Sequence, residues 1–262
     1  MLLDPRASAA GVRLISHELL PSTNIEALAL ARNGERGPLW VTAAEQTAGR
    51  GRRGRSWVSA AGNLFASLLL TDPAPPEHWA ELAFVAALAA HDAVVEVAPN
   101  VKPQLAIKWP NDLLLKNAKF GGILIEGENA ENGAVAVGIG INCANHPAAT
   151  DFPAIDLAAA GATVAPATLF ATLSAKMLGR LAQWNRGEHF ATIRTDWLSR
   201  AAGLGQTIRV RRAAADGDLI GRFETIDETG RLILMLPGRR AEAVEAGDVV
   251  GLALTQSGAG GP

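Results

Sequence analysis

Four strand-like runs follow one another closely near the middle of the chain, and they restrict its fold more than any other feature. The runs are residues 105–109, 113–116, 119–126 and 134–141. Pro110 ends the first run and holds the preceding residue in extended geometry, while Asn111-Asp112 favours a turn. Because such turns join neighbouring strands, the pattern predicts a mixed, mostly antiparallel sheet.

The remainder of the N-terminal part alternates between strand and helix patterns. Further strands are expected at residues 12–20, 39–47 and 64–70. Apolar residues three and four positions apart predict helices at residues 25–32, 79–97, 167–184 and 190–197. The predicted fold class is therefore α+β, with the flanking helices on one side of the sheet.

The sequence pattern changes after Gly203-Leu204-Gly205, where short strand-like runs replace the helices. These runs are residues 207–211, 219–226, 231–236 and 243–253. A segment of this kind predicts a small β-barrel. We expect one large domain at residues 1–203, the small barrel at 204–255 and a flexible tail at 256–262.

Composition limits the class of protein. The chain has 262 residues, of which 48% are apolar, so it can bury a large core. Cys143 is the single cysteine, which excludes an intrachain disulfide and a cysteine-based zinc site. The first residues lack a signal-peptide pattern, and no uncharged apolar stretch approaches the length of a membrane span. A soluble cytoplasmic protein is the default expectation.

The most unusual segment is Gly49-Arg50-Gly51-Arg52-Arg53-Gly54-Arg55, with Trp57 shortly after it. Four arginines and three glycines fall within these residues. Glycine lets a backbone approach a ligand closely, and arginine offers a planar cation that suits a carboxylate or a phosphate. We call residues 49–57 the arginine loop. Its composition predicts a mobile, cationic loop that encloses an anionic ligand.

Other interpretations of the arginine loop stay open on these residues alone. Gly49-x-Gly51-x-x-Gly54 satisfies the dinucleotide-binding fingerprint, but the helix that should follow is missing, because residues 64–70 resume a strand. A nucleic-acid arm would also be rich in arginine. The net charge of −2, from 24 basic and 26 acidic side chains, disfavours a dedicated nucleic-acid binder. A solvated turn is the remaining alternative.

Three further segments carry polar groups beside predicted strands or helices. Ser22-Thr23-Asn24 precedes a helix, and Thr23 begins a capping box, although a helix N-terminus also suits polar ligand groups. Lys119, before Gly121-Gly122, either neutralises an anion or is an ordinary solvated lysine. Asp112 either holds a magnesium ion or belongs to a plain Asn-Asp turn.

Together these segments resemble the biotin protein ligases, in the order and approximate spacing of that family. The matching motifs are Ser22-Thr23-Asn24, residues 45–57, Lys108-Trp109-Pro110-Asn111-Asp112 and Lys119-Phe120-Gly121-Gly122-Ile123-Leu124. The resemblance covers residues 14–253, and it implies a catalytic domain of the class II synthetase and lipoate-ligase type followed by a Src-homology-3-like β-barrel. Some members carry an N-terminal winged helix–turn–helix. The motifs here begin near residue 20, so DNA binding by that route is not expected.

The resemblance implies an ATP-dependent ligase that works in two steps. Biotin carboxylate attacks the α-phosphorus of ATP and gives biotinyl-5′-AMP and pyrophosphate. A lysine of a biotin carboxyl carrier domain, such as that of acetyl-CoA carboxylase, then attacks the mixed anhydride and releases AMP. Because the first step brings anions together, it needs fixed cations and positioning more than a protein nucleophile. Mg²⁺ would neutralise the departing pyrophosphate.

The resemblance also implies roles for individual residues. Those expected on biotin are Ser22, Thr23, Asn24, Gln46, Arg50, Gly51, Arg52, Lys119, Gly121 and Gly122. Those expected on ATP and the adenylate are Arg53, Arg55, Trp57, Asn111 and Asn142, with Trp57 against adenine. Lys119, Arg52 and Arg50 would be the catalytic cations, and Asp112 would be the Mg²⁺ ligand.

Three alternative functions accompany this interpretation. A lipoate ligase shares the adenylate chemistry, but the Gly-Arg-Gly-Arg-Arg-Gly loop favours biotin. A phosphate-binding or nucleic-acid-binding module would use the arginine loop alone, and a catalytically silent biotin-binding protein would not need Arg50, Arg52 and Lys119. The implied partners are biotin, ATP and a carrier domain, with no DNA and no membrane. A homodimer, frequent in the family, is also implied.

The implied role of Arg52 leads to a test. The Arg52→Gly variant loses a cation that retains the reactive adenylate, so it is expected to release biotinyl-5′-AMP and label lysines of unrelated proteins. Streptavidin blotting of serum albumin incubated with the variant, biotin and ATP measures this labelling. Labelling restricted to the carrier domain would show that Arg52 does not retain the adenylate.

Overall fold

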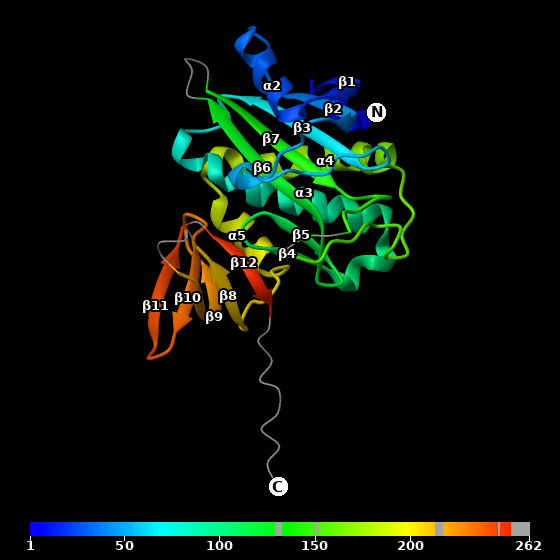
Figure 1. The fold of residues 1–262 in the computed structure, drawn as a ribbon. Coiled ribbons are helices and arrows are strands. Elements are labelled where there is room, and N and C mark those ends of the chain that lie inside the picture. The colour runs from blue at the N-terminus through cyan, green and yellow to red at the C-terminus, as the bar shows by residue number, and fades with distance from the viewer. Residues whose placement is uncertain (129–132, 149, 151, 213–216, 246, 253–262) are drawn as a thin grey trace.

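The computed structural model describes residues 1–128, 133–148, 150, 152–212, 217–245 and 247–252. Its centre is a seven-stranded sheet with the strand order β1-β2-β3-β7-β6-β5-β4 (Figure 1). The strands are β1 (Arg13–Leu20), β2 (Leu39–Gln46), β3 (Leu64–Thr71), β4 (Leu105–Lys108), β5 (Asp112–Leu115), β6 (Ala118–Glu128) and β7 (Ala134–Ile141). β1 pairs with β2 in parallel, and the other neighbours are antiparallel. The predicted mixed, mostly antiparallel sheet is confirmed.

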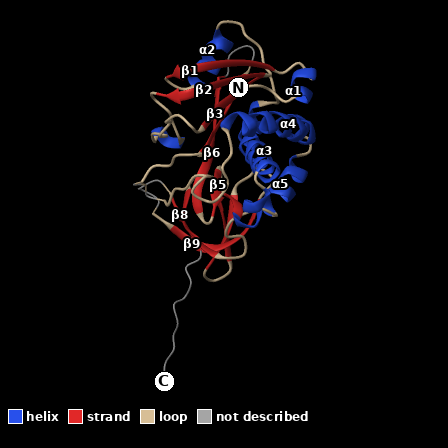
Figure 2. Ribbon diagram, turned by 90° about the vertical axis from the view of Figure 1, so that its right-hand side faces the viewer, coloured by secondary structure: helices blue, strands red, loops and turns tan. Residues whose placement is uncertain are grey.

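Helices cover both faces of this sheet. The helices are α1 (Pro5–Ala9), α2 (Thr23–Arg32), α3 (Leu82–Val97), α4 (Pro166–Trp184) and α5 (Phe190–Leu198). Figure 2 shows α3, α4 and α5 together on one side of the strands and α2 toward the other. The prediction of helices on one side only was therefore wrong for α2. Within the described residues, no helix is long and apolar enough to span a membrane.

The position of α2 follows from the alternation of side chains along β2. Trp40 packs into the large core with α3 and α4, whereas Leu39 and Val41 pack with Leu28 of α2 in a second core. Successive side chains of a strand point to opposite faces, so a strand that is apolar at every position needs cover on both. β3 satisfies the same condition, because seven of its eight residues, from Leu64 to Leu70, are buried.

The C-terminal part forms a separate five-stranded antiparallel sheet with the order β11-β10-β9-β8-β12, below the large sheet in Figure 1. The strands are β8 (Thr207–Arg211), β9 (Leu219–Ile226), β10 (Leu232–Leu236), β11 (Arg240–Val244) and β12 (Asp248–Leu252). The predicted single strand at 243–253 was wrong, since the chain leaves one edge of the sheet after β11 and enters the other as β12. At Gly247 the backbone passes so close to Val210 that a Cβ would lie 2.6 Å from its Cγ1. The predicted tail at 256–262 lies outside the described residues.

The two sheets share one hydrophobic core. Phe223 of β9 and Phe84 of α3 belong to the same cluster of buried side chains. The indole Nε1 of Trp109 donates to the carbonyl oxygen of Gly230 at 3.0 Å, and a Cβ at Gly230 would lie 2.7 Å from the ring of Phe84. This packing holds the small sheet against the end of the large one, so residues from both can line one site.

Phe170 of α4 provides a test of the main core. It is fully buried, and its ring meets Trp40 edge-on with 5.5 Å between the ring centroids. Phe170→Ala is expected to lower the free energy of unfolding by about 3–5 kcal/mol, because it removes apolar burial and leaves a cavity. Urea denaturation followed by circular dichroism measures the loss. The exposed Thr168→Ala is the control, with a change of about 0.5 kcal/mol or less; equal losses in both variants would contradict the expectation.

Candidate functional site

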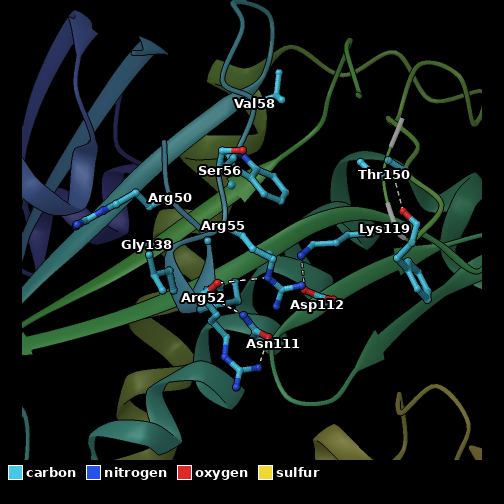
Figure 3. Close-up of a pocket in the computed structure, with 18 of the residues that line it drawn as sticks. Arg50, Arg52, Arg55, Ser56, Val58, Asn111, Asp112, Lys119, Gly138 and Thr150 are labelled. Atoms are coloured by element: carbon cyan, nitrogen blue, oxygen red, sulfur yellow. Dashed lines mark hydrogen bonds and ion pairs between the residues drawn. The ribbon is translucent and has the colours of Figure 1, made fainter. Parts of the chain in front are cut away.

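A cavity of about 340 Å³ lies between the arginine loop, strands β5, β6 and β7 of the large sheet, and the small sheet. Figure 3 shows labelled side chains from the arginine loop, β5 and β6 around it. Fourteen of the residues predicted to contact a ligand line it: Ser22, Thr23, Asn24, Gln46, Arg50, Gly51, Arg52, Arg55, Trp57, Asn111, Asp112, Lys119, Gly122 and Asn142. Four segments far apart in the sequence therefore meet at one place.

Two predicted residues, Arg53 and Gly121, are not among the described residues that line the cavity. Arg53 Nη1 points to Asp248, with 3.5 Å between Nη1 and Oδ2. At Gly121 a Cβ would lie 2.9 Å from Leu113 Cδ1 and 3.0 Å from the carbonyl oxygen of Gly140. Gly121 is therefore required for close packing in the sheet, and Gly122 is the glycine of the pair that faces the cavity.

The N-terminus of α2 opens into the cavity. Ser22 is the N-cap residue, and its side chain makes no capping hydrogen bond. Instead, the backbone N–H of Thr23 donates to Gln46 Oε1 of β2 at 2.8 Å. The predicted capping box at Thr23 was therefore wrong, because a neighbouring strand supplies the cap. Gln46 is fixed in turn, since its Nε2 donates to Ser59 Oγ at 2.9 Å.

Two glycines of β7 make room for side chains that line the cavity. A Cβ at Gly138 would lie 2.4 Å from Asn24 Oδ1, and one at Gly140 would lie 2.8 Å from Trp57 Nε1. Both glycines line the cavity and lie on the same face of the strand. The sequence interpretation missed them, although glycine at alternate positions of an apolar strand signals a close approach of a ligand or another chain segment.

Carboxylates hold the arginine side chains of the loop. Arg55 Nη2 lies 2.9 Å from both carboxylate oxygens of Asp248, the first residue of β12. Arg52 Nη1 donates to Asn111 Oδ1 at 3.3 Å and lies 3.9 Å from Asp248 Oδ1. Burial lowers the pKa of the Arg52 guanidinium, and the Asp248 carboxylate opposes this shift. Asp248 was missed by sequence analysis because it is distant in the chain and belongs to no matching motif.

The side chain of Arg50 points in a different direction from those of the other arginines in the loop. In Figure 3 it points away from Lys119 and Asp112. Its Nη2 lies 2.9 Å and 3.2 Å from the two carboxylate oxygens of Glu126 on β6. The arginine loop is therefore attached at one end to the large sheet and at the other to the small sheet.

Asp112 of β5 lies between two lysines. Lys119 Nζ is 2.5 Å from Asp112 Oδ1, and Lys108 Nζ is 2.9 Å from Oδ2. Burial by itself would raise the pKa of Asp112, but the fields and hydrogen bonds of Lys119 and Lys108 hold it below its ordinary value. Lys108 also donates to the carbonyl oxygen of Val249, so the small sheet contributes to this cluster as well. The cluster presents two fixed ammonium groups to the cavity.

The donor set of Asp112 does not fit a resident magnesium ion. Both of its carboxylate oxygens are bound by ammonium groups, which occupy the positions that a cation would take. Among the described residues, no group of three or more His, Cys, Asp or Glu side chains could hold a metal ion. The sequence expectation for Asp112 is therefore not supported, and a magnesium ion bound to nucleotide phosphates would enter as part of the substrate.

Trp57 and Asn142, which the resemblance assigns to the nucleotide, both line the cavity. Within the described residues, Trp57 Nε1 is buried without a hydrogen-bond partner, and Lys119 Nζ lies 5.3 Å from the centroid of the Trp57 ring. Asn142 Nδ2 donates to the carbonyl oxygen of Ile155 at 3.1 Å, which ties the end of β7 to the following loop. The indole Nε1 faces Gly140 of β7, where a Cβ would lie 2.8 Å from it.

Comparisons with known proteins agree with this geometry. Residues 18–143 match the biotin/lipoate A/B protein ligase family, and residues 203–250 match the biotin protein ligase C-terminal domain. The chain is 43% identical to the biotin–[acetyl-CoA-carboxylase] ligase of Paracoccus denitrificans over 239 residues, which cover 87% of this chain and 96% of that protein. It is 34% identical to the bifunctional ligase/repressor BirA of Bacillus subtilis, with 87% and 71% of the two chains covered.

Solved structures of biotin protein ligases share the fold of this chain. The Aquifex aeolicus biotin protein ligase in complex with biotin and ATP superposes with a TM-score of 0.75 at 23% identity, covering 90% of this chain and 97% of that one. The Leishmania major biotin protein ligase in complex with biotinyl-5-AMP gives a TM-score of 0.62 at 24% identity, with 89% and 99% covered. From the sequence matches, the chain belongs to the biotin protein ligase family.

Proposed function

We propose that this chain is an ATP-dependent biotin protein ligase, which forms biotinyl-5′-AMP and transfers biotin to a lysine of a biotin carboxyl carrier domain. One observation carries the proposal: four motifs separated in sequence line a single cavity with fixed cations, in a chain 43% identical to a biotin–[acetyl-CoA-carboxylase] ligase. In this scheme residues 1–203 form the catalytic unit, and residues 204–255 close one side of the cavity.

The cations suit the first step. The carboxylate oxygen of biotin forms a bond to the α-phosphorus, and the bond to the pyrophosphate oxygen breaks. Negative charge from both substrates is then concentrated in a small volume, so preorganised cations favour the transition state. Lys119 and Arg52 are assigned to the carboxylate and the α-phosphate, and Arg50 to the side of the cavity nearer the head group.

The remaining residues are assigned to one of two parts of the ligand, the cyclic urea of biotin or the nucleotide. The polar groups at the N-terminus of α2 and Gln46 are assigned to the cyclic urea of biotin. Arg55, Trp57, Asn111 and Asn142 are assigned to the nucleotide, and Arg53 acts with Arg55 through Asp248. Gly51 and Gly122 let the ligand approach the backbone.

The second step needs no side chain as a nucleophile. The amine of the carrier lysine attacks the biotinyl carbonyl carbon, and the bond to the phosphate oxygen of AMP breaks. Burial raises the pKa of Cys143 to about 12, so the single thiol remains protonated and takes no part. We place the reaction in the cytoplasm, with ATP supplied as its magnesium complex. Pairing of subunits and the lack of DNA binding stay predictions.

Intact-mass analysis of a biotin carrier domain tests the proposal. Incubation with this protein, biotin, ATP and magnesium is expected to add the mass of one biotinyl group to one lysine. The same mixture without ATP should give no gain, because the carboxylate is then not activated.

A parallel mixture with lipoate in place of biotin separates the nearest alternative. A gain with lipoate and none with biotin would move the chain to the lipoate ligases. No gain with either substrate would overturn the proposal and leave a binding module built on the arginine loop, whose oligonucleotide binding should then fall steeply with salt.

Gly138 provides a test of the end of the cavity that is assigned to the cyclic urea of biotin. Gly138→Ala places a Cβ 2.4 Å from Asn24 Oδ1, so Asn24 must move. The KM for biotin is expected to rise roughly 10- to 100-fold, because small displacements of a binding group are costly. Steady-state biotinylation at varied biotin measures it. Gly179→Ala on α4 is the matched control, since a Cβ there meets nothing within 4 Å; an unchanged KM in Gly138→Ala would contradict the assignment.

A further inference from the structure

Glu126 stands beside the cavity and belongs to none of the groups assigned above. It lies on β6, and its side chain is 28% exposed. Its carboxylate accepts hydrogen bonds from two residues. Asn24 Nδ2 donates to Oε2 at 2.8 Å, and Arg50 Nη2 donates to Oε1 at 2.9 Å. One carboxylate thus contacts both the N-terminus of α2 and the arginine loop.

The contact with Asn24 settles the orientation of its amide. The NH₂ group of an asparagine has two protons, and both are used here, by the carbonyl oxygen of Leu124 at 3.2 Å and by Glu126 at 2.8 Å. A carbonyl and a carboxylate accept hydrogen bonds only, so the amide cannot turn over without losing both. Asn24 Oδ1 must therefore face the opposite way, toward Ser67 Oγ at 2.6 Å.

The fixed amide also sets the direction of the hydrogen bonds behind it. Because Asn24 Oδ1 only accepts, the hydroxyl of Ser67 must donate to it. The Ser67 oxygen is then free to accept a hydrogen bond from the hydroxyl of Thr23. Ser67 Oγ is the closer of the two acceptors within reach of Thr23 Oγ1, at 2.7 Å against 3.2 Å for Gln46 Oε1. Thr23 and Asn24 are consequently left with oxygen lone pairs and no unused proton.

These lone pairs lie at the wall of the cavity. Thr23, Asn24 and Gly138 all line it, and the side chain of Asn24 packs directly over Gly138, where a Cβ would lie 2.4 Å from Oδ1. A ligand group at this place must donate a hydrogen bond. In the substrate of the proposed function, the ring N–H groups of the cyclic urea are such donors, whereas the urea oxygen is not.

We propose that Glu126 is a positioning residue for biotin specificity: it fixes Asn24 as an acceptor for a ring N–H of the cyclic urea. The inference rests on the proposed function. Glu126 acts on specificity through Asn24, whereas its partly exposed ion pair with Arg50 positions the arginine loop and does not set the orientation of the amide. Asn24 is 3% exposed, so a wrongly turned amide there would leave buried polar groups unpaired.

The test uses Glu126→Gln, which keeps the shape of the side chain but gives it an NH₂ group. This group can face Asn24 in place of the carboxylate, so that only the longer contact with the carbonyl oxygen of Leu124 still opposes a turned amide, and a fraction of the molecules presents a donor in place of the acceptor. Calorimetry with biotin is expected to give a Kd about tenfold higher than that of the wild type. The same titration with the two cyclic carbamate analogues, in which one ring N–H is replaced by oxygen, should show a clear loss of preference for biotin.

Glu128→Gln is the matched control. Glu128 lies two residues further along the same strand and pairs with Arg32 of α2 at 2.5 Å, outside the cavity. Both variants are expected to fold as the wild type does, judged by circular dichroism, and to keep its KM for ATP. If Glu126→Gln binds biotin and the carbamates as Glu128→Gln does, the inference is overturned.

A double variant separates the two contacts of Glu126. In an Arg50→Gln background, Glu126→Gln should still reduce the preference for biotin over the carbamates, because the effect passes through Asn24. If the effect disappears in that background, Glu126 acts through Arg50 and the inference is wrong. Failure of the wild-type protein to bind biotin would instead overturn the proposed function.

Discussion

The site depends on three carboxylates that form ion pairs with the arginine and lysine side chains around one cavity. Asp248 faces Arg52, Arg53 and Arg55, and Asp112 lies between two lysines. Glu126 holds Arg50. Six cationic side chains in such a small volume would repel one another, and the carboxylates offset that repulsion. All of these cations except Arg53 line the cavity. The arginine loop is thus held from both sheets.

This arrangement explains why the fold needs both sheets. Asp112 and Glu126 come from neighbouring strands of the large sheet, whereas Asp248 begins the last strand of the small one. The shared core that includes Phe84 and Phe223 fixes the small sheet, so Asp248 meets the arginine loop at a defined place. Preorganised charge is effective in catalysis because the protein does not have to rearrange as the reaction occurs.

In the proposed function, the end of the cavity assigned to the cyclic urea of biotin uses shape and hydrogen-bond direction in place of charge. Gly138 and Gly140 leave room for the side chains of Asn24 and Trp57, and the buried Ser67 contacts Asn24 Oδ1. A neutral ring with both donors and an acceptor is distinguished best by polar groups of fixed direction, since a mismatch leaves a buried group unpaired. The two ends of the cavity therefore use different physical means, suited to the neutral ring and the anionic group of one ligand.

Local signals in the amino-acid sequence were enough to predict the elements and to locate most residues of the candidate site. Strand and helix periods, Pro110 and the turn residues are local signals, so the mostly antiparallel large sheet and the positions of its strands could be predicted from them. The motifs on the arginine loop, before β5 and at the start of β6 could be located because their residue types are unusual at those places. The pairing between distant residues could not be predicted in this way and is known from the folded chain. Asn24 and Glu126 are 102 positions apart, and Arg53 and Asp248 are 195 apart. No local pattern encodes such a pair, because it exists only once the sheets have packed and brought their edges together.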